Sequence, residues 1–208
     1  MIAMPKALIF DCDGTLALTG ELHFKAFANA FTAQGAKLER SFYDTRTGLS
    51  RQALIEEWNS ASARQVEPAR LYRESLKQAR ALAAGGHAAP NPPVAELAHA
   101  WGARPSAVAS NGEASVVKAT LAACQLLHLF DAIVTVDDVA EGKPDPSMFL
   151  LAAERLATSP SDCLVLEDST QGIEAARRAG MMFLDVREAD ARATIAALLE
   201  QLPASAMA

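Results

Sequence analysis

A short apolar run at residues 7–10, Ala-Leu-Ile-Phe, is followed at once by two carboxylates and a glycine. Its β-forming composition predicts a buried parallel strand, and such a strand is typical of the sheet in an α/β fold. Asp11 and Asp13 lie two positions apart, so strand geometry points both side chains the same way at the carboxyl end of the strand. Gly14 permits a tight turn out of the strand. Carboxylates this close repel each other, so we expect a cation beside them, unless the tetrapeptide is only a polar turn.

The remainder of the chain alternates short apolar runs with helical periodicity. Strands are predicted at residues 107–109, 132–135, 163–166 and 181–185. Helices are predicted at residues 94–101, 113–124, 146–157 and 170–179, and from about 190 to before Pro203. Asp145 is expected to cap one of these helices and Pro146 to be its first residue. Strands that alternate with helices predict a parallel sheet covered on both faces, so the fold class is α/β.

Residues 18–89 interrupt this alternation, because they show helical periodicity and no strand signal. Helices are predicted at residues 21–34, 51–59 and 69–84. Ser50 is expected to cap the second of these helices and Pro68 to open the third. We therefore divide the chain into a sheet domain, made of residues 1–17 and 90–208, and an all-α insert at residues 18–89.

Composition and charge narrow the classes of partner. The formal net charge is −6 and Lys and Arg form no run, which argues against a nucleic-acid or anionic-membrane surface. The three cysteines fit neither a disulfide framework nor a zinc site, so we expect a reducing, cytoplasmic location. Residues 1–6 are too short for a signal peptide, and no apolar run reaches membrane-spanning length. Because no long exposed apolar stripe is evident, we expect a monomer.

Polar residues also follow later predicted strands at their carboxyl ends: Ser110, Asn111, Lys143, Glu167 and Asp168. Each has an ordinary structural explanation, the serine as a helix cap, the lysine as a solvated loop residue and the acidic pair as partners of a helix dipole. Their joint arrival at one sheet edge instead indicates a common site. Carboxylates for a hard divalent cation, a hydroxyl and an ammonium group are the parts that hold a phosphoryl group.

Four motifs carry a family resemblance. Asp-x-Asp-Gly-Thr-Leu at 11–16, Ser-Asn-Gly at 110–112, Gly-Lys-Pro-Asp-Pro at 142–146 and Leu-Glu-Asp-Ser at 166–169 resemble, in this order, the motifs of the haloacid dehalogenase superfamily of phosphotransferases. Within it, the chain is similar to the branch of β-phosphoglucomutase-like proteins and sugar-phosphate phosphatases. The likeness covers essentially the whole chain. It implies a Rossmann-like parallel-sheet core, with residues 18–89 as an inserted helical C1 cap domain.

The resemblance also implies a role for each acidic residue. Asp11 would attack phosphorus to form an aspartyl-phosphate, and Asp13 would act as general acid and then as general base. Mg²⁺ would be held by Asp11, the backbone carbonyl of Asp13, Asp168 and, directly or through water, Glu167. Strand geometry turns Cys12 to the opposite side, where we expect it to pack in the core.

Four further positions are assigned around the phosphate. By the resemblance, Ser110 and Lys143 would bind its equatorial oxygens. Thr15 would hydrogen-bond near the catalytic pair, and both Thr15 and Asn111 are assigned to substrate binding. The resemblance also predicts a cis peptide bond between Lys143 and Pro144, which an X-Pro sequence permits at little cost.

The helical insert supplies further candidates. His23 matches a position that faces the active-site mouth in the resembled family, although a lone histidine on a helix is commonly structural. Thr47 and Gly48 resemble a cap loop that approaches substrate. Arg51 has two open interpretations, a clamp for a distal phosphate or carboxylate and a surface arginine at a helix start.

The chain departs from the family pattern at both joints of the insert. Leu18 stands where this branch commonly has an aspartate, and Pro-Asn-Pro-Pro at residues 90–93 replaces the usual Pro-Gly-containing linker. The two joints must still let the cap open and close, because water exclusion and product release depend on that motion.

The leading hypothesis is a Mg²⁺-dependent phosphatase that hydrolyses a small phosphorylated metabolite, such as a sugar or polyol phosphate. Thr15 and the Ser-Asn-Gly triplet resemble phosphatase members more than the mutase. β-Phosphoglucomutase is the second hypothesis, which His23 and Arg51 keep open. The third is a regulatory protein that uses aspartyl phosphorylation as a signal, against which stand the helical insert and Asp13, an acid/base suited to turnover.

Overall fold

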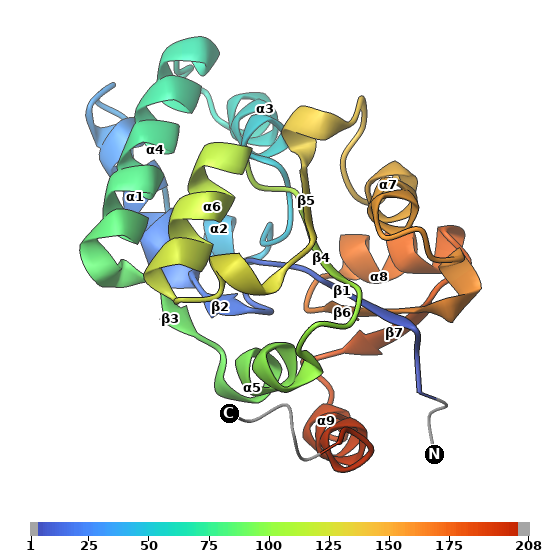
Figure 1. Ribbon diagram of the computed structural model, residues 1–208. Helices are drawn as coiled ribbons and strands as arrows, with labels where there is room; N and C mark the ends of the chain where they lie inside the picture. The colour runs from blue at the N-terminus through green and yellow to red at the C-terminus, as the bar shows by residue number, and fades with distance from the viewer. Residues whose placement is uncertain (1–3, 204–208) are drawn as a thin grey trace.

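The main sheet of the protein contains five parallel strands in the order β5-β4-β1-β6-β7 (Figure 1). The structure is a computed structural model that describes residues 4–203. The strands are β1 (Ala7–Phe10), β4 (Ser106–Ser110), β5 (Ala132–Thr135), β6 (Cys163–Glu167) and β7 (Met182–Asp185). The predicted α/β class with a Rossmann-like parallel sheet is confirmed. Because β1 pairs with β4 on one side and β6 on the other, the loops after these three strands meet at one sheet edge.

Helices cover both faces of the sheet. Leu8 and Phe10 pack against α5, α6 and α9, whereas Ala7 and Ile9 pack against α7 and α8. These helices are α5 (Pro92–Trp101), α6 (Ala114–Ala123), α7 (Ser147–Arg155), α8 (Thr170–Arg178) and α9 (Ala191–Glu200). Cys12 is fully buried on the side of Leu8 and Phe10, which confirms its predicted place in the core. The double cover anchors β1 and hence the carboxylates that follow it.

Four helices of the insert pack against one another, to the left of the main sheet in Figure 1. They are α1 (Gly20–Thr32), α2 (Arg40–Asp44), α3 (Arg51–Ala61) and α4 (Pro68–Leu82), and a π-helical turn, η1 (Ala83–His87), follows α4. Their shared core is aromatic, with the rings of Phe31 and Trp58 only 4.7 Å apart between centroids. Helix α2 escaped prediction because five residues are too few to show a helical period. The exact division of the chain into two domains stays a prediction.

The joints of the insert form a small antiparallel ladder between β2 (Ala17–Leu18) and β3 (Ala89–Pro90). The expectation of no strand within residues 18–89 is therefore corrected at both ends, since two-residue strands are too short to show alternation. Asn91, from the unusual second linker, donates its backbone N–H to Leu16 O at 2.8 Å and its side-chain amide to Thr15 O at 2.9 Å. The two joints therefore lie side by side and are tied together.

Among the helix starts predicted from a capping or opening residue, two are confirmed and one is corrected. Ser50 caps α3 by accepting a hydrogen bond from Ala53 N, and Pro68 is the first residue of α4. Helix α7 instead begins at Ser147, one residue late, because Asp145 forms a turn by accepting from Ser147 N at 2.9 Å. The Lys143–Pro144 peptide bond is cis, as predicted. Three short 3₁₀ turns complete the described elements: η2 (Leu127–Leu129), η3 (Val136–Asp138) and η4 (Pro160–Asp162).

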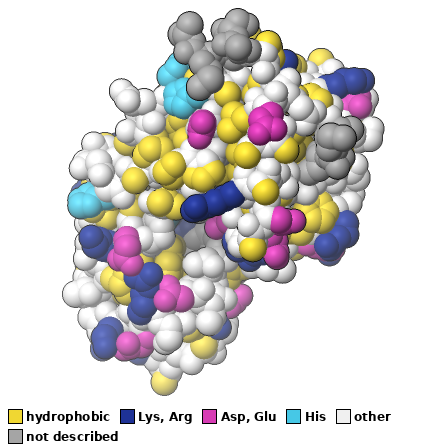
Figure 2. All heavy atoms as spheres, turned by 90° about the horizontal axis from the view of Figure 1, so that it is seen from below, with side chains coloured by type: hydrophobic (Ala, Val, Ile, Leu, Met, Phe, Trp, Pro, Cys, Tyr) yellow, Lys and Arg dark blue, Asp and Glu magenta, His cyan; other side chains and the backbone are white. Residues whose placement is uncertain are grey.

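The surface seen from below mixes hydrophobic side chains with charges of both signs (Figure 2). Lys and Arg are interspersed there with Asp and Glu. Within residues 4–203, no helix combines the length and apolar character that crossing a membrane requires.

Candidate active site

A cavity between the carboxyl edge of the sheet and the insert collects nearly all of the predicted site residues. Its lining includes Asp11, Asp13, His23, Thr47, Gly48, Arg51, Ser110, Asn111, Lys143, Glu167 and Asp168. Thr15 is the exception, since it is fully buried and donates its hydroxyl to Asp168 Oδ1 at 3.2 Å. That position agrees with a hydrogen bond near the catalytic pair but does not support a substrate contact by Thr15.

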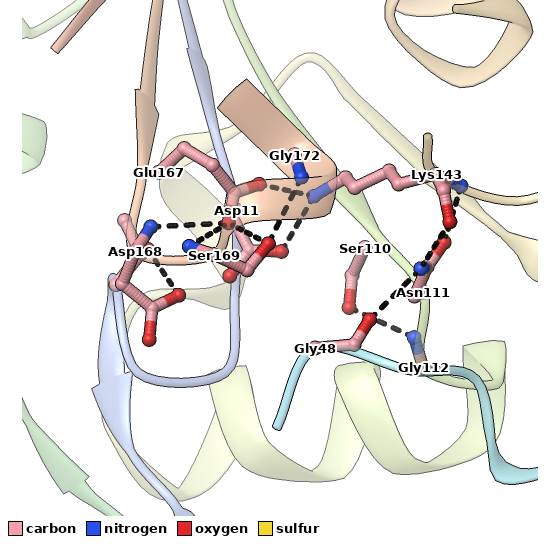
Figure 3. A network of polar contacts seen from close by, with 11 residues as sticks. Asp11, Gly48, Ser110, Asn111, Gly112, Lys143, Glu167, Asp168, Ser169 and Gly172 are labelled. Carbon is pink, nitrogen blue, oxygen red and sulfur yellow. Dashed lines mark hydrogen bonds and ion pairs between the residues drawn. The ribbon is translucent and has the colours of Figure 1, made fainter. Parts of the chain in front are cut away.

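Lys143 joins Asp11, the residue that follows β1, to Glu167, the last residue of β6 (Figure 3). Its Nζ lies 2.7 Å from Asp11 Oδ1 and 2.7 Å from Glu167 Oε2, and all three side chains are buried. Burial alone would lower the pKa of Lys143, but the two carboxylates raise it well above its ordinary value. Lys143 is therefore a fixed positive charge directly beside Asp11.

Glu167 is held by hydrogen bonds on both oxygens. Besides the bond from Lys143 to Oε2, its Oε1 accepts from Asp168 N at 3.0 Å, Ser169 N at 2.9 Å and Ser169 Oγ at 2.8 Å. Gly172 leaves the necessary room, because a Cβ there would lie 1.9 Å from Glu167 Oε2. Glu167 therefore orders the loop that carries Asp168.

Three carboxylates form a candidate metal centre. Asp11, Glu167 and Asp168 each offer an oxygen, and these oxygens lie within 4.8 Å of one another. Burial, followed by repulsion from Glu167, raises the pKa of Asp11 well above its usual range and that of Asp168 to about 7. Lys143 is the positive charge paired with this cluster, and it cannot balance three carboxylates. Because the ligand atoms are also hard oxygens, the residues fit a divalent cation. Asp13 does not add its carboxylate to this cluster, in agreement with its assignment through a backbone carbonyl.

The turn at Gly14 is needed to bring Asp168 into this cluster. Gly14 has a φ of +91°, and a Cβ there would lie 2.0 Å from Asp168 Oδ2. We expect Gly14→Ala to lose about 1–3 kcal/mol of unfolding free energy and to weaken metal binding, because Asp168 must move. Chemical denaturation and calorimetric Mg²⁺ titration measure the two effects.

Gly85→Ala is the matched control for that substitution. Gly85 has no positive φ, and its added Cβ would meet nothing closer than His87 at 3.8 Å. A Gly14→Ala variant that bound Mg²⁺ as tightly as the unaltered protein would contradict the expectation.

Asp13 faces the insert. Its Oδ1 accepts a hydrogen bond from Thr19 Oγ1 at 2.8 Å and lies 2.8 Å from His23 Nε2. Burial would raise the pKa of Asp13, but His23 and then Thr19 outweigh it and lower the pKa below its ordinary value. Asp13 is therefore held ionised in the absence of substrate, and His23 contacts it directly.

The last residue of β4 contributes a hydroxyl, and the residue after it bridges two loops. Ser110 Oγ accepts from Gly112 N at 3.0 Å, which leaves its own proton free for an acceptor in the cavity. Asn111 accepts from Lys143 N at 2.8 Å and donates to Lys143 O at 3.2 Å and to Gly48 O at 3.1 Å. The side chain of Asn111 therefore ties the Lys143 loop and the insert together, and its assignment to substrate binding stays a prediction.

The insert lies against the sheet domain at two further points. Gly48, with a φ of +89°, packs so closely on the loop after β6 that a Cβ there would lie 2.8 Å from Ser169 Cβ. Arg51 Nε donates to Glu113 Oε1 at 2.9 Å, and the Arg51 guanidinium also lies over the ring of Phe27. The predicted cap loop therefore packs against the sheet domain and lines one side of the cavity.

Several important contacts come from residues that the sequence did not single out. They are Thr19, which binds Asp13; Glu113, which binds Arg51; Ser169, which binds Glu167; and Gly172, which leaves room for Glu167. Ser169 lies within the Leu-Glu-Asp-Ser motif, so this residue could have been predicted from the motif. Glu113 follows the Ser-Asn-Gly triplet directly, but an acidic residue before a helix is most simply explained by the helix dipole.

Comparison with known proteins gives the family. A profile for the hydrolases described as haloacid dehalogenase-like hydrolase matches residues 5–180, which is most of the chain and includes all four motifs. The chain belongs to the haloacid dehalogenase-like hydrolase family. The predicted resemblance is confirmed, and the chain is an enzyme of the hydrolase class.

Two curated relatives match most of the chain. Fructose-1-phosphate phosphatase YqaB of Escherichia coli is 36% identical over 86% of this chain and 95% of its own length. Protein CbbY of Rhodobacter capsulatus is 37% identical over 85% of this chain and 82% of its own length. Among solved structures, CbbY of Rhodobacter sphaeroides, crystallised with phosphate and as a variant with xylulose-1,5-bisphosphate, is 32% identical with a TM-score of 0.80, covering 86% of this chain and 85% of that one.

Proposed function

We propose that this haloacid dehalogenase-like hydrolase is a Mg²⁺-dependent phosphatase that acts on a small sugar or polyol phosphate. One observation carries the proposal. The Asp11 carboxylate lies beside the fixed charge of Lys143 and within the three-carboxylate cluster, while Asp13 stands two residues on, in the same cavity. A nucleophile, a cation site and an acid/base therefore surround a single point.

The first step transfers the phosphoryl group to the enzyme. An Asp11 carboxylate oxygen attacks phosphorus, the bond from phosphorus to the ester oxygen breaks, and the departing alkoxide takes a proton from Asp13. His23, 2.8 Å from Asp13, is placed to share and supply that proton. Lys143 and the free hydroxyl proton of Ser110 bind the phosphoryl oxygens as their charge is redistributed.

The second step releases phosphate. Asp13, now ionised, removes a proton from a water molecule, which attacks phosphorus and breaks the bond to the Asp11 oxygen. The lowered pKa of Asp13 favours this basic form. Both starting residues are regenerated, so the cycle consumes one water and one monoester.

Asp11, Asp168 and the Asp13 backbone carbonyl would hold Mg²⁺, and Glu167 would support them. When bound, the ion offsets the repulsion between the Asp11 carboxylate and an incoming phosphate dianion. The raised pKa values of Asp11 and Asp168 support this assignment, because burial, followed by repulsion from Glu167, causes them and a bound cation would offset both effects. A small phosphorylated sugar as substrate is supported by the names of the relatives.

Metal removal is expected to abolish turnover reversibly. Dialysis against a chelator should remove at least about 99% of phosphate release, as expected when several kcal/mol of charge stabilisation are lost, and added Mg²⁺ should restore it. Asp168→Asn should shift the Mg²⁺ concentration for half-maximal activity upward. Full activity after exhaustive chelation would contradict the metal assignment.

The proposed activity is tested by measuring phosphate release with Mg²⁺ from a panel of phosphorylated sugars, polyols, short acids and nucleotides. Release from one group of monoesters would support the proposal and name the substrate class. Isomerisation of β-glucose 1-phosphate that depends on the 1,6-bisphosphate, with little free phosphate, would instead make the protein a mutase. Stable phosphorylation of Asp11 without turnover would favour a signalling role. The cytoplasmic location and the monomeric state stay predictions.

A further inference from the structure

One wall of the cavity carries a buried ion pair that phosphoryl transfer does not use. Arg51, the first residue of α3, donates through Nε to Glu113 Oε1 at 2.9 Å, and Glu113 directly precedes α6. The two side chains are only 4% and 5% exposed. Both residues line the same cavity as Asp11. The pair therefore joins the insert to the sheet domain within reach of a substrate.

Each member of this pair keeps one buried polar atom without a partner. Arg51 Nη1 and Glu113 Oε2 make no hydrogen bond of normal geometry among the described residues. The Tyr72 hydroxyl also lies near Glu113, because burial, followed by Glu113, raises the pKa of Tyr72 to about 12. Buried polar atoms of this kind destabilise a protein unless a ligand or water satisfies them. A hydroxyl group suits one donor and one acceptor, because it can accept from the arginine and donate to the carboxylate. A phosphate oxygen suits only the arginine, and Glu113 would repel it.

The other charges around the cavity also disfavour a second phosphate. Lys143 is paired with Asp11 and Glu167, and Arg46 Nε lies 2.8 Å from Glu57 Oε2. Over residues 4–203, every lysine and arginine that lines the cavity thus has a carboxylate partner. Five carboxylates line it, and only three side chains there carry a permanent positive charge. Beyond the Asp11 centre, an additional dianion would meet no uncompensated cation.

We propose that Arg51 and Glu113 form a specificity pair that binds hydroxyl groups at the distal end of the substrate. The enzyme then takes monophosphates of neutral polyhydroxy compounds and discriminates against bisphosphates. This inference rests on the proposed phosphatase function and narrows its substrate class. It replaces the interpretation of Arg51 as a clamp for a distal phosphate, because Glu113 neutralises that guanidinium.

The first test compares matched substrates on the unaltered protein with Mg²⁺. We expect kcat/KM for fructose 1-phosphate to exceed that for fructose 1,6-bisphosphate by about tenfold or more. Glu113 repels the second phosphate of the bisphosphate, and about tenfold is the effect of losing one charged hydrogen bond. A matched pentulose monophosphate and bisphosphate should show the same order. Equal or greater kcat/KM for both bisphosphates would overturn this inference and leave the phosphatase proposal intact. No phosphate release from any monoester, including the wider panel, would overturn both.

The second test removes the charge of Glu113. Glu113→Gln keeps an oxygen for Arg51 Nε but frees the guanidinium charge, so the preference for monophosphate should fall by about tenfold. The change should come chiefly from a lower KM for the bisphosphate, with little change in its kcat. Circular dichroism and Tm establish that the variant is folded. If it does not fold, the substrate comparison on the unaltered protein decides the question.

Glu57→Gln is the matched control for Glu113→Gln. Glu57 also pairs with an arginine that lines the cavity, but it is half exposed and does not line the cavity itself. Solvent screens that pair, so the substrate preference should stay within about twofold of the unaltered value. An unchanged preference in folded Glu113→Gln, or an equal shift in Glu57→Gln, would overturn the specificity pair.

Discussion

Asp11→Asn is expected to reduce phosphate release by a factor on the order of 10⁴ or more, the scale seen when a covalent catalyst loses its nucleophile. An amide oxygen cannot form the acyl-phosphate that turnover requires. It can still accept the hydrogen bond that Lys143 now donates to Asp11 Oδ1, so the loop should keep its position. Steady-state release from the best monoester of the panel measures the loss.

Stability measurements separate lost chemistry from lost fold in this variant. Burial raises the pKa of Asp11, so its ionised form destabilises the folded state at every pH above the ordinary carboxyl pKa. Without divalent metal at neutral pH, Asp11→Asn should therefore have an equal or higher Tm than the unaltered protein. Asp162→Asn, at a surface ion pair with Lys6, is the control and should keep full activity. Substantial residual turnover in pure Asp11→Asn would contradict the nucleophile assignment.

Asp13→Asn is expected to reduce steady-state turnover by at least about 10²-fold, the scale of general acid–base catalysis. The loss should depend on the leaving group. A p-nitrophenyl ester departs without a proton donor, so the first step should proceed while hydrolysis of the phosphorylated Asp11 stalls. Rapid mixing should then show a burst of p-nitrophenol close to one equivalent per enzyme, followed by a slow phase.

The same variant should be less stable than the unaltered protein. His23 and Thr19 lower the pKa of Asp13, so its ionised form stabilises the fold above the ordinary carboxyl pKa, and that contribution is lost as pH falls through the lowered pKa. At neutral pH, Asp13→Asn should therefore lower Tm, opposite in sign to Asp11→Asn. If the burst and the slow phase of Asp13→Asn both equal those of the unaltered protein, Asp13 is not the general acid and base.

Local sequence patterns predicted most of the sheet and the centre of the site. The apolar runs at residues 7–10, 132–135 and 163–166 became β1, β5 and most of β6 because buried parallel strands demand such runs. Asp11 and Asp13 could be placed because strand period and parallel topology determine where they point. The insert was harder to predict in detail. Helix α2 and the β2–β3 ladder are short, and tertiary packing rather than periodicity stabilises them.

The cap residues show where sequence reasoning reached its limit. His23 had a structural and a functional interpretation, and only the folded chain brings it to 2.8 Å from Asp13. Arg51 had two interpretations, a phosphate clamp and a surface arginine, and its burial beside a carboxylate partner rules out the surface arginine. That partner, Glu113, is 62 positions away in the sequence and belongs to the other domain of the predicted division. No local pattern marks such a pair.

The α/β sheet, the family and the residues of the candidate centre could be predicted from the sequence, because strand ends and four short motifs specify them through local geometry. How the insert contacts that centre became known only from the folded chain. It placed Gly48 on Ser169, His23 on Asp13 and Arg51 on Glu113. No local pattern predicts these contacts, because each of them joins residues on opposite sides of the cavity. The charge and hydrogen-bonding capacity left over for a substrate depend on which partners packing brings together.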